Sequence, residues 1–332
     1  MSDRTMDRRE FLKRAAGAAA VAGGLSSALP AASSSPLAPA YDAKGLPTRI
    51  FGKTGVRVPR LGVGLGSRFC AVTDPDKAQA ILQTALDRGF YYWDSASTYR
   101  NKDIFSEERI GRILETRRKE VFLATKCEAR TYDETLLEIE GSLKRLRTDH
   151  IDLYQIHLLQ SAADVEVIAS KDGALKALRR LKDEKVVRFI GFTGHLSAEA
   201  MTAAARSGDY DAMLIALNHY AERRGDLEKD SIAAAAAQGL GIAVIKVIRP
   251  RETVAGVTAD ELIRYALSLG EVHAAMLGMD GLEVVEKNAA LLRAFEPLPA
   301  AEMARIGSTL APFFAGRNLP WMDPAYRDGH YA

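Results

Sequence analysis

Residues 121–157 read VFLATKCEARTYDETLLEIEGSLKRLRTDHIDLYQIH, two apolar strand patterns separated by one helical pattern. Strands are expected at Val121–Lys126 and Ile151–His157, because both runs are rich in β-branched and aromatic residues. A helix is expected at Asp133–Leu146, where apolar residues recur at the helical period: Leu136, Leu137, Ile139, Leu143 and Leu146. This order indicates a βαβ unit with parallel strands.

The same alternation continues on both sides of this unit. Six further strands are expected at Arg60–Val63, Tyr91–Asp94, Arg188–Thr193, Ala212–Asn218, Ile242–Val247 and Val272–Gly278. Eight strands with intervening helices predict an α/β fold of the (β/α)8 TIM barrel type over residues 48–296. A β-hairpin turning at Gly52–Gly55 is expected to cap its bottom. Residues 41–47 are predicted as a linker, and residues 297–332 as a C-terminal tail packed on the barrel.

A doubly wound dinucleotide-binding sheet is the competing α/β architecture. It requires G-x-G-x-x-G between its first strand and first helix. The nearest stretch is Gly62–Ser67, in which Ser67 stands in the place of the third glycine. We therefore expect a tight loop over the barrel mouth at this position.

Charge and cysteine content narrow the function further. The chain of 332 residues has 45 Lys and Arg against 43 Asp and Glu, and these balance once residues 1–40 are removed. This balance gives no support to nucleic-acid or anionic-membrane binding. Cys70 and Cys127 are too few for a disulfide framework, an iron–sulfur cluster or a four-ligand zinc site, so no metal site is expected. The sequence leaves open whether the two cysteines pair.

The amino terminus has the pattern of a targeting segment. Residues 8–13 read RREFLK and precede an uncharged run rich in Ala, Gly and Ser. They resemble the twin-arginine (Tat) export signal, Ser/Thr-Arg-Arg-x-Phe-Leu-Lys, with Asp7 at the Ser/Thr position. Because the run consists mainly of Ala, Gly and Ser rather than Leu and Ile, a stable membrane span is not expected in the mature form. Ala38–Ala40 offers a small-x-small cleavage site before Tyr41.

We therefore predict that residues 1–40 are a signal peptide read by the Tat export machinery. The protein would fold in the cytoplasm and then be exported to the periplasm. The alternative is a disordered basic tail on a cytoplasmic enzyme.

Four polar residues end the expected strands or follow them closely. Asp94 ends the second strand, and Tyr99 follows five residues later. Lys126 ends the third strand and His157 the fourth. Active sites of TIM barrels lie at this carboxyl end of the strands, so the four residues are candidate catalytic groups.

Three motifs around these residues resemble the aldo-keto reductase family. Trp93–Tyr99 with Ser106–Gly111 is similar to the family signature Phe-Asp-Thr-Ala-x-x-Tyr-Gly-x-Ser-Glu…Gly. Gly141–Leu146, continuing to His157, is similar to a second family motif at the same spacing. Arg188–Thr193 is similar to the family's fifth strand.

The resemblance implies that Asp94, Tyr99, Lys126 and His157 form the family's catalytic tetrad. Tyr99 would act as the general acid that protonates a carbonyl oxygen as hydride reaches the carbon. A free tyrosine, with a pKa of about 10, is a reluctant donor. The Lys126 charge is expected to lower that pKa, while Asp94 holds the ammonium in place. His157 is expected to hydrogen-bond and orient the substrate oxygen.

The resemblance also implies a site for the nicotinamide end of NADP or NAD. Family positions that hold the carboxamide match Thr193, Gly194 and Asn218. Lys246 stands where many members stack an aromatic ring on the nicotinamide. Arg249 follows in the next loop, where its guanidinium would suit the pyrophosphate.

The adenosine end is expected at the last βα unit. NADP-specific members carry cations at the positions of Gly278 and Val284, and an adenine-binding asparagine at the position of Asn288. Val284 is equally well explained as a core residue of the last helix. Since neither cationic position is basic here, a looser preference between NAD and NADP is expected.

These patterns together predict an exported NAD(P)(H)-dependent oxidoreductase. It would reduce an aldehyde, ketone or sugar carbonyl, or oxidise the alcohol, and retain its cofactor tightly outside the cytoplasm. The alternative is a non-catalytic barrel that binds a nicotinamide cofactor or sugar as a sensor or accessory subunit. Arg100 replaces the glycine after the tyrosine, and the insertion at Asn101–Phe105 is expected to lengthen the loop over the site. The tail aromatics would cover the barrel wall or line the substrate pocket: Phe313, Phe314, Trp321, Tyr326 and Tyr331, with Met322 among them.

Overall fold

The computed structural model describes residues 39–195, 197–217, 221–222, 225–248, 254–315 and 330–331. Residues 1–38 of the predicted signal lie outside these ranges, and so do the predicted cofactor residues Asn218 and Arg249. The side chains of the tail aromatics also lie outside the described part of the chain.

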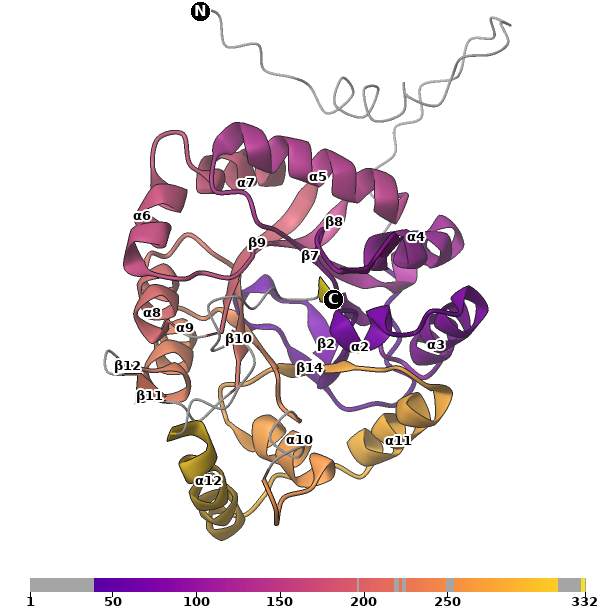
Figure 1. Cartoon of the computed structure of the whole chain (residues 1–332), viewed down its shortest axis with the longest axis vertical. Helices are drawn as coiled ribbons and strands as arrows, with labels where there is room; N and C mark the ends of the chain where they lie inside the picture. Colours follow the sequence, from indigo (N-terminus) through magenta and orange to yellow (C-terminus); the bar gives the residue numbers. More distant parts are fainter. Residues whose placement is uncertain are drawn as a thin grey trace, which may run out of the picture.

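Eight parallel strands close into a barrel, which confirms the predicted (β/α)8 fold (Figure 1). Around the barrel the order is β10-β13-β14-β3-β4-β7-β8-β9. The strands are β3 (Leu61–Gly64), β4 (Tyr92–Asp94), β7 (Phe122–Cys127), β8 (Ile151–Ile156), β9 (Val187–Gly194), β10 (Ala212–Ala216), β13 (Gly241–Ile245) and β14 (Ala274–Gly278). Each overlaps one of the eight expected strands.

Helices form a ring outside these strands (Figure 1). They are α3 (Pro75–Asp87), α4 (Ser106–Arg117), α5 (Tyr132–Leu146), α6 (Ala162–Ala169), α7 (Ala174–Asp183), α8 (Ala198–Arg206), α9 (Ala233–Ala237), α10 (Ala259–Ser268), α11 (Leu282–Arg293) and α12 (Ala300–Ala315). The short helix α2 (Ser67–Cys70) lies inside the ring, after β3 (Figure 1). Shorter turns are the 3-10 helices η1 (Gly52–Thr54) and η2 (Arg118–Glu120) and the π-helix η3 (Leu227–Ile232). Among the described residues, no helix is long and apolar enough to cross a membrane.

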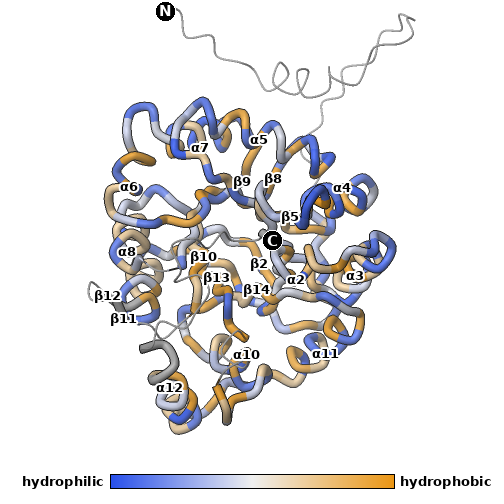
Figure 2. Tube along the Cα trace, viewed as in Figure 1, coloured by the Kyte–Doolittle hydropathy of each residue, from blue (hydrophilic) through white to orange (hydrophobic). Residues whose placement is uncertain are grey.

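The barrel strands are buried on both faces, because the helices cover the outside and side chains fill the inside. Every residue of β7, β8 and β10 is buried. Figure 2 shows hydrophobic colours along β10, β13 and β14, whereas helices such as α5 alternate between hydrophobic and hydrophilic residues. Leu137 was expected on the apolar face of α5, and this expectation is wrong, because its side chain is 69% exposed. One helical step beyond Leu136 turns it away from the core.

The predicted hairpin lies beneath the barrel. Strands β1 (Thr48–Ile50) and β2 (Arg57–Pro59) pair antiparallel. Phe51 between them is fully buried and packs edge-on against Tyr92 and Phe122, with ring centroids 5.6 and 6.3 Å apart. Gly52 has φ +51° and touches the backbone at Gly241, so a side chain at this residue would meet the barrel itself.

A small sheet lies over the carboxyl end of the barrel. The insertion after Tyr99 forms strands β5 (Arg100–Asn101) and β6 (Ile104–Phe105), which pair antiparallel. Strand β15 (His330–Tyr331), the short yellow arrow within the ring in Figure 1, pairs parallel with β5. The tail therefore reaches the barrel mouth, while its helix α12 packs outside the barrel against α10. A second hairpin, β11 (Ala221–Glu222) and β12 (Gly225–Asp226), follows β10.

The chain near Tyr41 is tied to the opposite, amino-terminal end of the barrel. The Tyr41 ring stacks on Tyr91 with centroids 5.1 Å apart. Its hydroxyl donates to Asp152 at 2.8 Å, and Asp152 also pairs with Arg118 and Arg188. The first residues of the expected mature chain thus belong to the folded barrel.

Candidate active site

Three of the four candidate catalytic side chains meet at the Lys126 ammonium. Nζ of Lys126 donates to Oδ2 of Asp94 at 2.7 Å, to the Ser95 carbonyl at 2.5 Å and to the Tyr99 hydroxyl at 3.3 Å. The His157 ring lies edge-on to the Tyr99 ring, with centroids 5.7 Å apart. All four side chains are buried.

Strand register brings these residues together. Strands β4, β7 and β8 are neighbours, with Asp94 opposite Ala124 and Lys126 opposite Gln155. The His157 N–H donates to the Cys127 carbonyl at 2.8 Å, which continues the ladder one residue beyond β8. Parallel strands end at the same edge of a sheet, so three separate strand ends supply one cluster.

The Asp94 carboxyl is held inside the barrel by its partners. Burial raises its pKa, and the Lys126 charge and hydrogen bonds from Lys126 and Gln155 oppose that rise. Gln155 donates from Nε2 to Oδ1 of Asp94 at 3.1 Å, so both carboxylate oxygens accept from side chains. The sequence analysis missed Gln155. Its signal was its place two residues before His157, on the same face of an apolar strand.

The loop after β3 shapes the wall beside Tyr99. A Cβ at Gly66 would lie 3.1 Å from the Tyr99 ring, so a side chain there would push the ring by a few tenths of an ångström. Cys70 and Ala96 pack with Tyr99 in a small apolar cluster apart from the main core. Cys70 and Cys127 are separate buried thiols, and burial raises the pKa of Cys70 to about 12.

Thr193 and Gly194, the predicted nicotinamide contacts on β9, also make close contacts within the barrel. The Thr193 hydroxyl accepts from the Leu158 N–H at 2.9 Å, which ties the chain after His157 to β9. A Cβ at Gly194 would lie 2.5 Å from Sδ of Met201, so α8 occupies the space that a side chain would need. Lys246 follows β13 with φ +63°, a left-handed conformation that a lysine seldom adopts.

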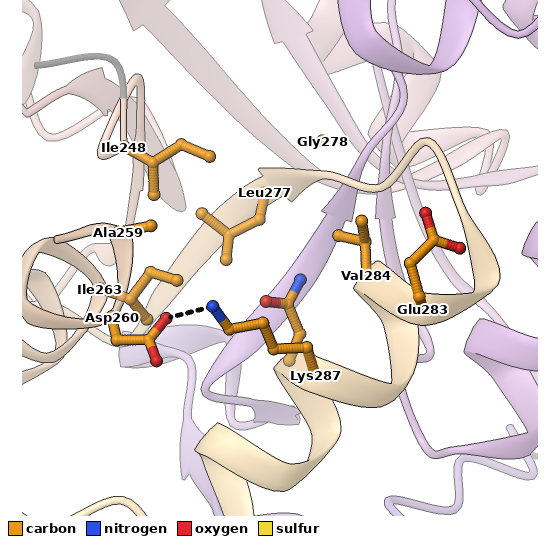
Figure 3. Close-up of a pocket in the computed structure, with 10 residues that line it drawn as sticks. Ile248, Ala259, Asp260, Ile263, Leu277, Gly278, Glu283, Val284 and Lys287 are labelled. Carbon is orange, nitrogen blue, oxygen red and sulfur yellow. Dashed lines mark ion pairs between the residues drawn. The ribbon is translucent and has the colours of Figure 1, made fainter. Parts of the chain in front are cut away.

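A cavity of about 270 Å³ lies between α10 and α11 (Figure 3). The predicted adenosine residues Gly278, Val284 and Asn288 line it, together with Ile248, Ala259, Asp260, Ile263, Leu277, Glu283 and Lys287. Val284 also packs against the core, so it serves both of the roles considered for it.

Two cations near this cavity were missed by the sequence analysis. Lys287 of α11 forms an ion pair with Asp260 of α10 across the cavity, with Nζ 3.1 Å from Oδ1 (Figure 3). A Cβ at Gly278 would lie 2.7 Å from Cβ of Arg68, so the aliphatic part of this α2 side chain occupies the space beside Gly278. Arg68 pairs with Asp280 at 3.4 Å.

A model of the aldo/keto reductase family matches residues 60–250, more than half of the chain. The chain belongs to this family. The aldo-keto reductase YhdN of Bacillus subtilis is 31% identical over 163 residues, 45% of this chain and 46% of that protein. The chain thus spans just under half the length of this curated relative.

Two further comparisons cover most of both chains. L-galactose dehydrogenase of Arabidopsis thaliana is 24% identical over 321 residues, 82% of this chain and 96% of that protein. A crystal structure titled as an aldo-keto reductase from Klebsiella pneumoniae in complex with NADPH has a TM-score of 0.63 at 21% identity. It covers 80% of this chain and 95% of that chain, and it shows the shared fold.

Proposed function

We propose that this family member is an NAD(P)(H)-dependent oxidoreductase in which Tyr99 is the general acid and base. The observation that carries the proposal is the buried Lys126 ammonium. It lies 2.7 Å from the Asp94 carboxylate and 3.3 Å from the Tyr99 hydroxyl. A sensor or accessory barrel would have no use for a buried cation held against a phenol.

In carbonyl reduction, the Tyr99 hydroxyl gives its proton to the substrate oxygen. A bound nicotinamide cofactor supplies the hydride. Lys126 stabilises the phenolate that Tyr99 becomes, because a positive charge favours the ionised phenol. Asp94 and Gln155 keep the ammonium at this place. His157 donates a hydrogen bond to the substrate oxygen and orients it. In alcohol oxidation the same proton moves back to Tyr99.

The cavity between α10 and α11 fits the adenosine end of the cofactor. Apolar side chains of Ile263, Leu277 and Val284 offer walls for a flat ring, and the buried Asn288 amide offers polar contacts. Such a mixture of apolar walls and few polar groups is typical of cofactor sites. Gly278 leaves the end of β14 without a side chain at the cavity.

The described charges around this cavity predict no strong choice between NAD and NADP. Lys287 and Arg68 could each attract a 2′-phosphate, but both pair with carboxylates, Asp260 and Asp280. Glu283 adds another negative charge to the lining. Repulsion from these acids offsets the attraction of the cations, so we propose that the enzyme uses either cofactor.

We propose a small carbonyl compound or a sugar as the substrate. L-galactose dehydrogenase, one similar protein, is named for a sugar. Strands β5 and β15 pair next to the loop that carries Tyr99, and a cover at this place would favour a small molecule over a polymer.

We propose further that residues 1–40 direct the folded enzyme through the Tat machinery to the periplasm. Tyr41 follows the proposed cleavage site, so removal of the signal would keep its contacts with Tyr91 and Asp152. It would remove the hydrogen bond that the Ala40 N–H donates to the Lys119 carbonyl. Because this route carries folded proteins, the cofactor can be inserted in the cytoplasm. Periplasmic turnover then requires that it stay bound between catalytic cycles.

The Tyr99→Phe variant tests the proposed role directly. It should bind cofactor as the wild type does but lose roughly 10² to 10⁴ in turnover, because it deletes one hydroxyl and keeps the ring. Tyr91→Phe is the matched control, since it removes a buried hydroxyl that donates to the Arg57 carbonyl of β2, away from the site. Wild-type turnover of Tyr99→Phe with any carbonyl substrate would contradict the assignment.

A further inference from the structure

A carboxylate outside the proposed tetrad lies beside His157. Oε1 of Glu128 is 3.6 Å from Nδ1 of the His157 ring. The same oxygen accepts a hydrogen bond from the Thr98 hydroxyl at 3.3 Å. The His157 side chain is 1% exposed and that of Glu128 is 52% exposed. Glu128 therefore stands between the buried imidazole and solvent at the carboxyl end of β7.

The loop that carries Glu128 is held firmly in this position. The Glu138 carboxylate accepts the backbone N–H of Glu128 at 3.0 Å and that of Ala129 at 3.0 Å. Arg130 donates to the Glu128 carbonyl at 2.9 Å and to the His157 carbonyl at 2.9 Å. One guanidinium thus ties both backbones together. These bonds fix the backbone from which the Glu128 side chain reaches His157, and the Thr98 hydroxyl bonds to the end of that side chain.

Other charged or titratable groups around His157 come from three strands and two loops. In the loop after β7, the Arg130 guanidinium lies on the His157 carbonyl and pairs with Asp164 at 2.6 Å. Asp94 of β4 and Lys126 of β7 neutralise each other at 2.7 Å. Tyr99 lies in the loop after β4, and His195 follows the neighbouring strand β9. Glu128 adds a negative charge on the Nδ1 side of the imidazole. A carboxylate there favours a proton on Nδ1 and favours the doubly protonated ring over the neutral one.

We propose that Glu128 is a positioning residue for His157. It holds the Nδ1–H toward the loop after β7 and favours the doubly protonated ring, whose Nε2–H then donates to the substrate oxygen. This inference rests on the proposed reductase function for its catalytic consequence. The proton arrangement of the ring itself can be tested without any substrate.

Histidine-selective nitrogen NMR of the full chain gives the first test. His157→Gln identifies the His157 signal among the 6 histidines. In the wild type, Nδ1 of His157 should carry a proton. Glu128→Gln should lower the pH at which the neutral His157 ring takes up its second proton by about one unit. Glu128→Asp should recover part of this shift. Identical titrations in the wild type and Glu128→Gln would overturn the proposal, whether or not the protein is a reductase.

Kinetics give the second test. Glu128→Gln should lower kcat/KM at neutral pH by about tenfold, which corresponds to one pH unit in His157 protonation. In a His157→Gln background the same change should alter kcat/KM less than about twofold, because the pair acts as a unit. Glu166→Gln, an exposed carboxylate on α6, is the matched control and should behave as the wild type. Equal losses in both backgrounds would contradict action through His157. Absence of turnover in the wild type would instead refute the reductase function alone.

Discussion

Lys126→Met would leave the Asp94 carboxyl buried without its cation. In the wild type the two side chains are 1% and 4% exposed and lie 2.7 Å apart. Gln155 would remain as a donor to Asp94, but it carries no charge. Removing one partner of a buried ion pair typically costs about 3–5 kcal/mol. Because domains unfold with about 5–15 kcal/mol, this loss is large enough to measure by denaturation.

The stability deficit should depend on pH in a defined direction. Burial already raises the pKa of Asp94, and loss of the ammonium would raise it further. In the unfolded chain the carboxyl titrates near its ordinary pKa of about 3.9. Between these two values the folded state binds more protons than the unfolded state, so stability falls as the pH rises through this window. The deficit should therefore be largest at pH 7 and smaller at pH 5.

Urea unfolding at both pH values would measure this effect in the wild type, Lys126→Met, Asp94→Asn and the double variant. The double variant should be more stable at pH 7 than Lys126→Met, since it buries no carboxylate. Turnover of Lys126→Met should also fall, and the apparent pKa of the acidic group in its pH–rate profile should rise. A deficit below about 1 kcal/mol at pH 7 would refute the buried pair, and so would equal deficits at pH 5 and pH 7.

Two further predictions concern the cofactor and the export signal. Equilibrium titration should give affinities for NADH and NADPH within about 100-fold, or about 2.7 kcal/mol, and Lys287→Met should weaken NADPH binding more than NADH binding. A larger preference for NADPH that survives in Lys287→Met would exclude this lysine as the 2′-phosphate partner. Changing both Arg8 and Arg9 to Lys should leave folded, active enzyme in the cytoplasm. Wild-type protein purified from the periplasm and dialysed should release nicotinamide cofactor when it is denatured. Normal export of the double variant would reject the Tat assignment, and an empty periplasmic barrel would reject cofactor retention.

The barrel and the placement of its candidate tetrad could be predicted because both depend on local patterns. The spacing of apolar residues along the chain distinguishes strands from helices, and this spacing predicted all eight strands. The carboxyl ends of parallel strands meet at one end of a barrel. Asp94, Lys126 and His157 were therefore expected at one place from their positions at strand ends alone.

Only the tertiary structure decided which side chains meet across the site. Gln155 contacts Asp94, and Glu128 contacts His157, because neighbouring strands pair in one register and the loop after β7 bends back. The rotation of α5 about its axis turned Leu137 to solvent although its spacing suited a core position. Periodicity does not settle such a choice between adjacent apolar residues, because packing against neighbouring helices selects the buried face.

The charges of the cofactor cavity depend on chain segments that are distant in sequence. Arg68 reaches Gly278 only because β3 and β14 are neighbours in the closed barrel, and Lys287 reaches Asp260 only because α10 and α11 flank one cavity. The sequence assigned no cation to the adenosine end of the cofactor site. It could be compared with the family only one position at a time, and the two family positions that carry cations are Gly278 and Val284 here. Pairing between residues far apart in the chain depends on closure of the barrel, and the local order of residues does not encode which of them will then face each other.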